Sequence, residues 1–235
     1  TGTVTIGASG GSGAIRIGSL GAIDLSGESF GLAPRGGAVT FSNGITLPND
    51  ATFTLNTAGI TGSGSTDVTI GGTSGTLVVN ATGTVSLATN LRRLTATSVG
   101  SNLTVSNTGA LDLGASSITG NLSLTTSGAL TDSGTVSVTG TTSLTAGSGN
   151  NITLDSVADD FGGAVSIVSG NNVTLVDANT LDLGASTISG NLGVTTAGAL
   201  TDSGTITVTG TTSLTAGSGN NITLDSAANN FSTVA

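Results

Sequence analysis

Carboxylates are the side chains through which this chain could do chemistry. Its 235 residues include no His, Cys or Lys, which excludes Ser–His, Cys–His and Ser–Lys nucleophile pairs. Two carboxylates can cleave glycosides, and Asp159-Asp160 is the adjacent acidic pair. One repeat later the same positions hold Asn229-Asn230. Acid–base catalysis would not survive that exchange, whereas a solvated turn would, and Trp and Tyr platforms for sugars are absent. We expect no enzymatic activity and no catalytic residues.

Calcium is the other ligand that these acidic residues suggest, because Asp and backbone carbonyl oxygens in turns can bind it. Asp177, Asp182 and Asp159-Asp160 lie near expected turns. The Gly-Gly-x-Gly-x-Asp repeat motif and the EF-hand pattern are both missing. We therefore expect no cofactor and no dedicated metal site, with weak calcium binding left open. The acidic residues would mainly provide solubility and repulsion between neighbouring molecules.

Cationic side chains are few. Four arginines stand against 13 acidic residues, which gives a net charge of -9. This balance makes nucleic acid an unsuitable partner, because few groups could neutralise phosphates. The segment Leu91-Arg92-Arg93-Leu94 is either an exposed strand edge or a small basic contact point, and we favour the strand edge.

An internal duplication indicates how these residues are positioned. Residues 111–165 return at 181–235 with a constant offset of 70 and 41 identities in 55 positions. The segment Thr141–Ser156 is unchanged at Thr211–Ser226. Repetition of this kind is typical of stacked architectures, in which each unit buries its apolar face against its neighbours.

The composition excludes several other classes of protein. A mean hydropathy of +0.35 argues against disorder, and two prolines with irregularly spaced glycines argue against collagen. No stretch reaches the roughly 18–20 apolar residues of a membrane span. The absence of Cys removes disulfides and thiolate metal sites.

Apolar residues alternate with Thr and Ser in short runs, which predicts an all-β fold. Gly, Ser and Asn clusters end each run after a few residues, and no window has a helical period. The expected strands include the runs at 3–6, 14–17, 22–25, 122–124, 136–138, 152–154, 165–167 and 173–175.

The repeat favours a right-handed parallel β-helix, or β-solenoid, over a β-sandwich, since a sandwich does not recur along its own sequence. Equivalent strand positions stand at Leu144, Ile167, Val194 and Leu214, and the interval from the first to the last is one whole repeat. These positions predict three turns per repeat, with turns of about 20–27 residues and a rod on the order of 50 Å long.

We expect two regions along this rod. Residues 1–110 would form irregular solenoid turns, with a protruding loop near 31–37 and a turn at Pro48-Asn49-Asp50. Residues 111–235 would form a regular solenoid, whose second 70-residue copy is incomplete.

Two residue types have expected structural roles inside the coil. Asn pairs at 150–151, 171–172 and 220–221 precede strands and either follow simple turn preference or form ladders of amide hydrogen bonds between turns. Phe161 and Phe231 occupy one repeat position and would plug a wide corner of the core. We favour this role over ligand stacking.

The segments 120–131 and 134–146, with their Gly-Asn-Leu-Ser-Leu-Thr-Thr and Gly-Thr-Val-Ser-Val-Thr-Gly patterns, resemble repeats of filamentous-haemagglutinin-type large exoproteins. The resemblance extends over about residues 95–235. It implies a right-handed β-helical rod, secreted to the surface of a Gram-negative bacterium and adhesive in function. A convincing secretion domain of that family is not found at the N-terminus.

The combined expectation is a structural and adhesive segment of a secreted or cell-surface bacterial fibre. Its partners would be other copies of itself and host-cell or matrix carbohydrate or protein. The array stops at Ala235, partway through its second repeat and without a polar cap, which suggests either a longer chain or head-to-tail docking into a filament. A self-assembling filament subunit and, less favoured, a polysaccharide-active β-helix enzyme are the alternatives.

Overall fold

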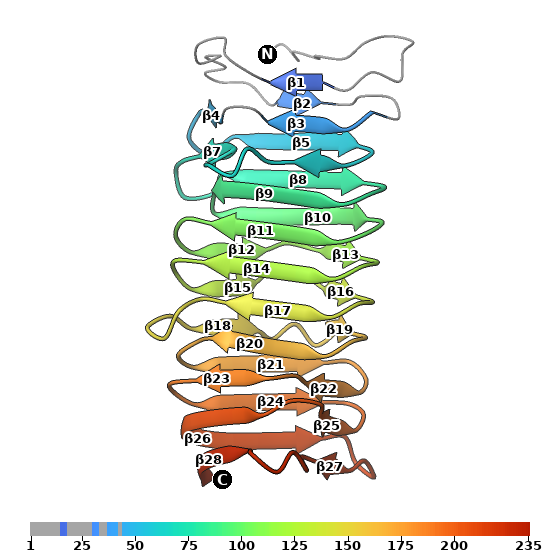
Figure 1. Cartoon of the computed structure of the whole chain (residues 1–235), viewed down its shortest axis with the longest axis vertical. Coiled ribbons are helices and arrows are strands. Elements are labelled where there is room, and N and C mark those ends of the chain that lie inside the picture. Colours follow the sequence, from blue (N-terminus) through green and yellow to red (C-terminus); the bar gives the residue numbers. More distant parts are fainter. Residues whose placement is uncertain (1–14, 18–29, 33–36, 42–43) are drawn as a thin grey trace.

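The chain folds into a parallel β-solenoid of about ten turns (Figure 1). The computed structural model describes residues 15–17, 30–32, 37–41 and 44–235. Within these residues there are 28 strands and no helix, so the all-β prediction is confirmed. It follows that this part of the chain has no helix long and apolar enough to cross a membrane.

The strands belong to two sheets, which form opposite faces of the rod except near its C-terminal end. There β23 (Ser186–Ile188) belongs to the 15-stranded sheet but lies on the face of the other sheet, where Ile188 pairs with Gly170. The 13-stranded sheet contains β1 (Ile15–Ile17), β3 (Val39–Phe41), β4 (Ile45–Leu47), β6 (Ile60–Thr61), β7 (Val68–Ile70), β9 (Val85–Asn90), β11 (Leu103–Asn107), β14 (Leu122–Thr126), β17 (Thr142–Thr145), β20 (Val165–Ser169), β22 (Leu181–Leu183), β25 (Leu200–Asp202) and β27 (Ile222–Thr223).

The 15-stranded sheet contains β2 (Phe30–Leu32), β5 (Thr52–Thr57), β8 (Thr76–Ala81), β10 (Arg93–Val99), β12 (Leu111–Leu113), β13 (Ser116–Ile118), β15 (Leu130–Asp132), β16 (Val136–Val138), β18 (Ile152–Leu154), β19 (Asp160–Phe161), β21 (Val173–Asp177), β23 (Ser186–Ile188), β24 (Leu192–Thr196), β26 (Ile206–Ala216) and β28 (Asn230–Val234). Strand β26 is long enough to turn a corner, and its first part pairs with β23 while its second part pairs with β24.

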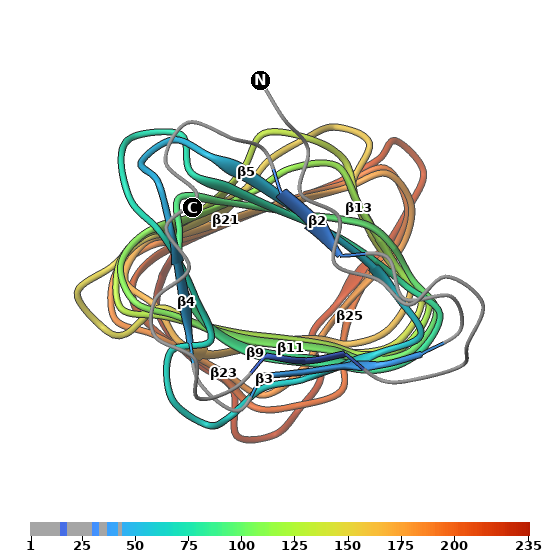
Figure 2. The same cartoon turned by 90° about the horizontal axis from the view of Figure 1, so that it is seen from above.

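Seen from one end, the rod is a flattened tube with two long sides (Figure 2). A shorter side near the N-terminal end contains β4, which pairs with β7. The nearer strands β9, β11 and β14 run from right to left while the chain descends, so the coil is right-handed, as predicted (Figure 1).

Alternation along each strand produces the core. In β14, Leu122 and Leu124 are buried and Ser123 between them faces outward. Leu124 is in register with Val105 on one side and Leu144 on the other. Such columns of Leu, Val and Ile continue from turn to turn and form one narrow apolar core between the sheets. Parallel ladders of backbone hydrogen bonds hold the turns together along both faces.

The strand register defines the length of each turn. The shortest turn links Leu77 to Leu94, and the longest links Ile60 to Val85. The additional residues of the longer turns are accommodated in the loops at the corners, since the paired strands keep their register.

One 70-residue repeat makes three and a half turns. Three whole turns run from Leu122 through Thr142 and Val165 to Leu183. The short remainder of the repeat carries the chain across the rod to Leu192, the repeat counterpart of Leu122. Accordingly β14 lies in the 13-stranded sheet and its counterpart β24 lies in the 15-stranded sheet. The two copies therefore occupy opposite faces of the rod.

This finding corrects the predicted three turns per repeat. Leu144 does pair with Ile167, and Val194 does pair with Leu214. The predicted step from Ile167 to Val194 is wrong, because Val194 pairs with Leu175 of the opposite sheet. Strands of both faces have the same alternation of apolar and hydroxyl residues, so the pattern does not reveal the face to which a strand belongs.

The Asn residues form hydrogen-bonded ladders at the surface of the rod. Asn151 Oδ1 accepts from the backbone and side-chain N–H groups of Asn172, each at 3.2 Å. Asn172 Oδ1 accepts from Asn191 N at 3.0 Å, and Asn191 Oδ1 accepts from Thr211 N at 2.8 Å. The predicted ladder is confirmed for the second residue of the pairs at 150–151 and 171–172. Asn150 and Asn220 instead donate to backbone carbonyl oxygens, both of their own turn and of the preceding one. Asn220 Nδ2 donates to Ala197 O of the preceding turn at 3.0 Å and to Gly217 O at 3.1 Å, and Asn150 Nδ2 donates chiefly to Ala146 O at 2.7 Å.

The two repeat-related phenylalanines both contact the core. Phe161 is buried and pairs in register with Val138, whereas Phe231 is half-buried and pairs with Val208. The predicted core position is thus confirmed for Phe161, and Phe231 packs at the edge of the core.

The N-terminal expectations are tested in part. Strand β1 confirms most of the run at 14–17, and Asn49-Asp50 forms the predicted turn, with Asp50 at a φ of 62°. Of the expected loop near 31–37, residues 31–32 belong to β2, and residues 33–36 lie outside the described part of the chain. The runs expected at 3–6 and 22–25 also lie outside it.

Candidate functional site

Asp159 and Asp160 are adjacent in the sequence but occupy different environments. Asp159 is fully buried, and its Oδ1 accepts a 2.7 Å hydrogen bond from Val136 N in the previous turn. Asp160 Oδ1 accepts from Asn179 Nδ2 at 2.9 Å on the surface. The prediction of a solvated turn is therefore wrong for Asp159, which is buried because its carboxylate replaces a carbonyl as acceptor in the backbone ladder.

Burial dominates the electrostatics of Asp159. Desolvation raises the pKa of its carboxyl group to about 7, against the hydrogen bond from Val136 that lowers it, and the nearby charges of Asp132, Asp177 and Asp155 raise it further. Its second oxygen, Oδ2, is buried and makes no hydrogen bond. A proton on this oxygen would remove the cost of a buried charge.

The repeat counterpart of Asp159 shows how the position is satisfied by a neutral group. Asn229 Oδ1 accepts from Ile206 N at 2.8 Å, just as Asp159 accepts from Val136. In addition, Asn229 Nδ2 donates to Asp202 Oδ2 at 2.7 Å. Asp202 is the counterpart of Asp132, so the amide makes the bond that a protonated Asp159 would make. Desolvation acts to raise the pKa of Asp202, but hydrogen bonds from Asn229, Ser226 and Asp225 outweigh it and lower the pKa.

Asp177 repeats this arrangement in the next turn of the same corner, where Ala178 N donates to Asp159 O at 2.7 Å. It is buried, its Oδ2 accepts from Phe161 N at 2.9 Å, and its Oδ1 accepts from Asn179 N at 2.8 Å. Desolvation raises its pKa. Its repeat counterpart, Asn107, accepts from Leu91 N at 3.0 Å. Aspartate and asparagine thus exchange at buried positions that accept a backbone N–H from the neighbouring turn.

The acidic residues named as calcium candidates lie in two places. Asp182 lies on β22, where its Oδ1 accepts from Thr201 Oγ1 at 3.5 Å. Asp159 and Asp177 lie in successive turns of one corner, where each accepts a hydrogen bond from a backbone N–H group. Among the residues that the structure describes, no group of three or more acidic side chains is placed to hold a metal ion.

A groove of about 300 Å³ lies where four consecutive turns meet one corner of the rod. We call it the arginine groove, and it is lined by Thr73, Ser74, Arg92, Arg93, Ala110, Leu111, Asp112, Ala129 and Thr131. It combines cationic, hydroxyl and small apolar side chains. The segment at 91–94 therefore contributes to a concave site as well as to the edge of a strand.

The two arginines of the groove differ in their partners. Arg93 Nε lies 2.6 Å from Asp112 Oδ2 in the next turn, which also accepts from Ser133 Oγ at 2.7 Å. Arg92 Nε donates to the backbone oxygen of Gly72 at 3.3 Å and has no carboxylate partner in the structure. Both guanidinium groups are exposed, and they are the cations whose side chains the structure describes.

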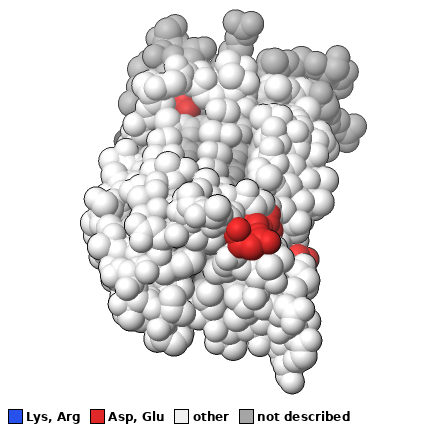
Figure 3. Space-filling view, turned by 60° about the horizontal axis from the view of Figure 1, so that its bottom comes forward, with Lys and Arg blue, Asp and Glu red and all other residues white. Residues whose placement is uncertain are grey.

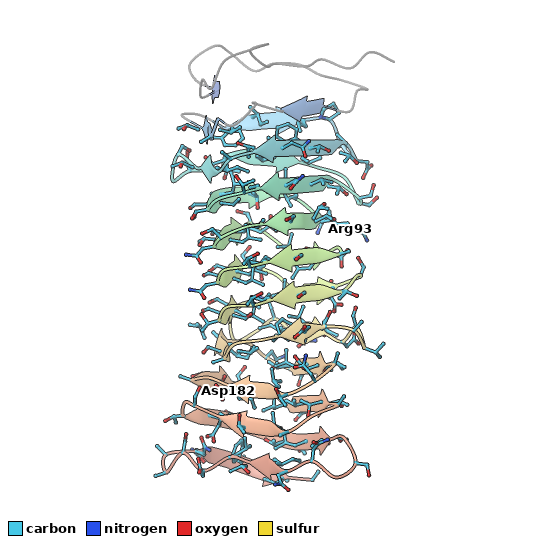
Figure 4. All side chains as sticks on the ribbon, turned by 90° about the vertical axis from the view of Figure 1, so that its right-hand side faces the viewer. Arg93 and Asp182 are labelled. Carbon is cyan, nitrogen blue, oxygen red and sulfur yellow. The ribbon has the colours of Figure 1, made fainter. Side chains whose placement is uncertain are left out.

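The duplicated copy lacks this site. Asp112 has Asp182 as its counterpart. Leu94 pairs with Leu113 in the first copy, and Val165 pairs with Leu183 in the second. This register places Gly163 and Ala164 where the first copy has its two arginines. Arg93 lies at one edge of the rod and Asp182 at the other, because the copies are half a turn out of phase (Figure 4). The opposite face therefore presents the aspartate without its cation.

Sequence reasoning identified Arg92 and Arg93 but missed their surroundings. Asp112, Ala110 and Thr131 lie further along the chain, in later turns, and only the turn length brings them to the same corner. The Leu-Asp-Leu-Gly-Ala-Ser motif could have drawn attention to Asp112, because the motif and its aspartate are identical in both copies of the repeat.

Comparison with known proteins identifies the repeats. The family described as repeats of unknown function (DUF5649) matches two segments, 100–168 and 170–235, whose starts are offset by one repeat length. No curated protein and no solved structure matches the chain. The family matches together cover more than half of the sequence. The chain therefore belongs to the family of DUF5649 repeats of unknown function.

Proposed function

We propose that this chain is a structural and adhesive segment of a bacterial extracellular fibre, in which it acts as a rigid rod or stalk. The observation that carries the proposal is the continuity of the rod. Parallel ladders run from β3 to β28, and a single apolar core extends from Val39 to Val208. A body of stacked turns with one core transmits force along its axis, because bending it requires many hydrogen bonds to open together.

The outer surface supports the same role. Outward-facing strand positions are mostly Thr and Ser, and only 7% of the residues are charged. Most of the face drawn in Figure 3 is neither acidic nor basic. Such a surface is hydrated, and the net charge of -9 disfavours aggregation of neighbouring rods.

The resemblance to filamentous-haemagglutinin-type exoproteins supports a location outside the cell, on a Gram-negative surface, and an adhesive use of the rod. Host-cell or matrix carbohydrate or protein would be the target, and other copies of the chain would be neighbours in the fibre. We infer no catalytic role, because the buried carboxylates serve as acceptors for backbone N–H groups.

The rod part of the proposal is tested by stretching the whole chain between handles at its two ends in optical tweezers. Single turns should unravel one after another, each adding about 60–85 Å of extended chain. Gradual lengthening at low force, as from a flexible polymer, would contradict a rigid rod.

The adhesive part is tested separately with beads that carry the whole chain. They should adhere to cultured epithelial cells or matrix-coated glass better than beads carrying an unrelated acidic protein of similar net charge. Equal adhesion by both kinds of bead would remove the adhesive role and leave the rod as a spacer.

A further inference from the structure

We infer that the arginine groove binds a saccharide that carries a carboxylate group, such as a uronic acid residue. The inference concerns a site on the surface of the rod, outside its apolar core. It goes beyond the proposed fibre and does not depend on it, because it rests on the charge, shape and hydroxyl groups of one corner.

Charge is the first argument. In a chain with a net charge of -9, the described cationic side chains are concentrated in this groove. Arg93 is balanced by Asp112 at 2.6 Å, whereas Arg92 has no carboxylate partner among the residues that the structure describes. The residues that line the groove therefore have a net charge of +1, with the Asp50 carboxylate hydrogen-bonded to Ser74 at its edge, and the lining would attract a monoanion. The planar guanidinium of Arg92 retains its two Nη groups, whose fork matches the two oxygens of a carboxylate.

Shape and lining indicate the remainder of the ligand. A volume of about 300 Å³ is at the lower end of the range for small-molecule sites and accommodates about one sugar ring. Ala110 and Ala129, which are half-buried, provide a small apolar surface for the C–H face of a ring. The hydroxyl groups of Thr73, Ser74 and Thr131 can exchange hydrogen bonds with ring hydroxyls.

The remaining hydroxyl capacity can be assigned to particular atoms. Ser74 Oγ donates to Asp50 Oδ1 at 3.0 Å, so it offers its lone pairs to a ligand. Thr131 Oγ1 makes no hydrogen bond in the structure and can both donate and accept. An acidic peptide fits less well, because the backbone around the groove is already paired within the ladders and leaves few groups for a second chain.

The whole chain, labelled with ¹⁵N, should be titrated at low salt with methyl β-glucuronoside while the amide signals are followed. Signals of Arg92, Arg93, Asp112 and Thr131 should shift in a saturable manner. Methyl β-glucoside, acetate and methyl glucoside 6-sulfate are the comparison ligands, and each should bind at least about tenfold more weakly. Comparing these ligands separates the contributions of the carboxylate, the sugar ring and the geometry of the anion to binding.

Two substitutions in the groove should change the affinity for the glucuronoside in opposite directions. Arg92→Gln should weaken binding of the glucuronoside at least about tenfold. Asp112→Asn should strengthen it, because it removes the carboxylate that competes for Arg93 and keeps an acceptor for Ser133. Asp182→Asn, at the duplicated position on the opposite face, is the matched control and should leave binding unchanged.

Three results would overturn the inference. If the neutral glucoside bound as tightly as the glucuronoside, the carboxylate would not be recognised. If acetate bound as tightly, the sugar ring would not be recognised. Binding of the sulfate ester as tight as that of the glucuronoside would remove the selectivity for a planar anion. Folding of each variant is verified from its unshifted core amide signals, so a loss of binding reports on the groove. Beads can adhere through other surfaces of the chain, and the groove can bind a glycoside without supporting adhesion, so the two proposals can fail separately.

Discussion

Asp and Asn side chains at buried and half-buried positions act in this molecule as extensions of the backbone ladder. Asp159 and Asn229 each accept an N–H from the preceding turn, and so do Asp177 and Asn107. The amide performs this role without a charge, whereas the carboxylate performs it in a site that disfavours ionisation. Asp159 should therefore make the stability of the rod depend on pH.

The first prediction concerns the substitution Asp159→Asn. The pKa of Asp159 is raised to about 7 in the folded chain and is about 3.9 in the unfolded chain. Between these values the folded state binds a proton that the unfolded state has released, so stability falls as the pH rises through this window. Asp159→Asn should raise the midpoint of urea unfolding at pH 8 and have little effect at pH 4.

The duplicated position supplies the reciprocal variant. Asn229→Asp replaces an amide that donates to Asp202 Oδ2 at 2.7 Å, and it should destabilise the rod at pH 8 more than at pH 4. Other carboxylates titrate in the same range, so each variant is compared with the wild type at the same pH. A difference between variant and wild type that is independent of pH would contradict the raised pKa of Asp159.

At the scale of strands and corners, close stacking of the backbone limits which residues the corners tolerate. Gly140 N donates to Gly120 O at 3.1 Å, and Gly210 N donates to Gly190 O at 2.9 Å. These glycines occupy the same corner of the two repeat copies. A side chain at such a position would separate two turns that are in direct backbone contact.

The second prediction compares two glycines of one repeat. A Cβ at Gly140 would lie 2.6 Å from Gly120 O, so Gly140→Ala should destabilise the rod by about 1–3 kcal/mol. Gly149 has no heavy atom within 4 Å of such a Cβ and does not have a positive φ. Gly149→Ala is the control and should be neutral or slightly stabilising. Urea unfolding of both variants measures the difference, and equal midpoints would contradict the close contact at Gly140.

The strands themselves were largely predictable from the sequence, because a period of two marks the residues that face the core. The face to which each strand belongs was not predictable, since Leu144 and Val194 lie in identical patterns on opposite sheets. The burial of Asp159 was also missed, because its neighbours Asp160 and Ser156 are polar. The ion pair between Arg93 and Asp112 depends on the length of one particular turn, which only the register reveals.

At the scale of the whole molecule, the half-turn offset between copies has a measurable geometry. Ser143 and Ser213 are repeat counterparts on opposite faces. Three and a half turns separate them by roughly 17 Å along the axis, and the two sheets add about 10 Å across it. Ser203, which directly follows β25 on the face that contains Ser143, lies three turns from Ser143 and roughly 14 Å away.

The third prediction uses these serines as labelling sites. The chain contains no Cys, so Ser143→Cys with Ser213→Cys can take two spin labels cleanly. Double electron–electron resonance should report a separation above about 20 Å, because the labels point away from opposite faces. The pair Ser143→Cys with Ser203→Cys should instead show the strong dipolar broadening of close labels. A short distance for the first pair would restore three turns per repeat.

The half-turn phase has a consequence for how such a chain can change its length. Near-identical coding segments recombine readily, and each event would add or remove one whole unit. A single addition would lengthen the molecule by roughly 17 Å and would also rotate everything beyond it by half a turn about the rod axis. Two additions would restore the original orientation. The parity of the unit count would thus decide which side of the fibre displays a feature such as the arginine groove.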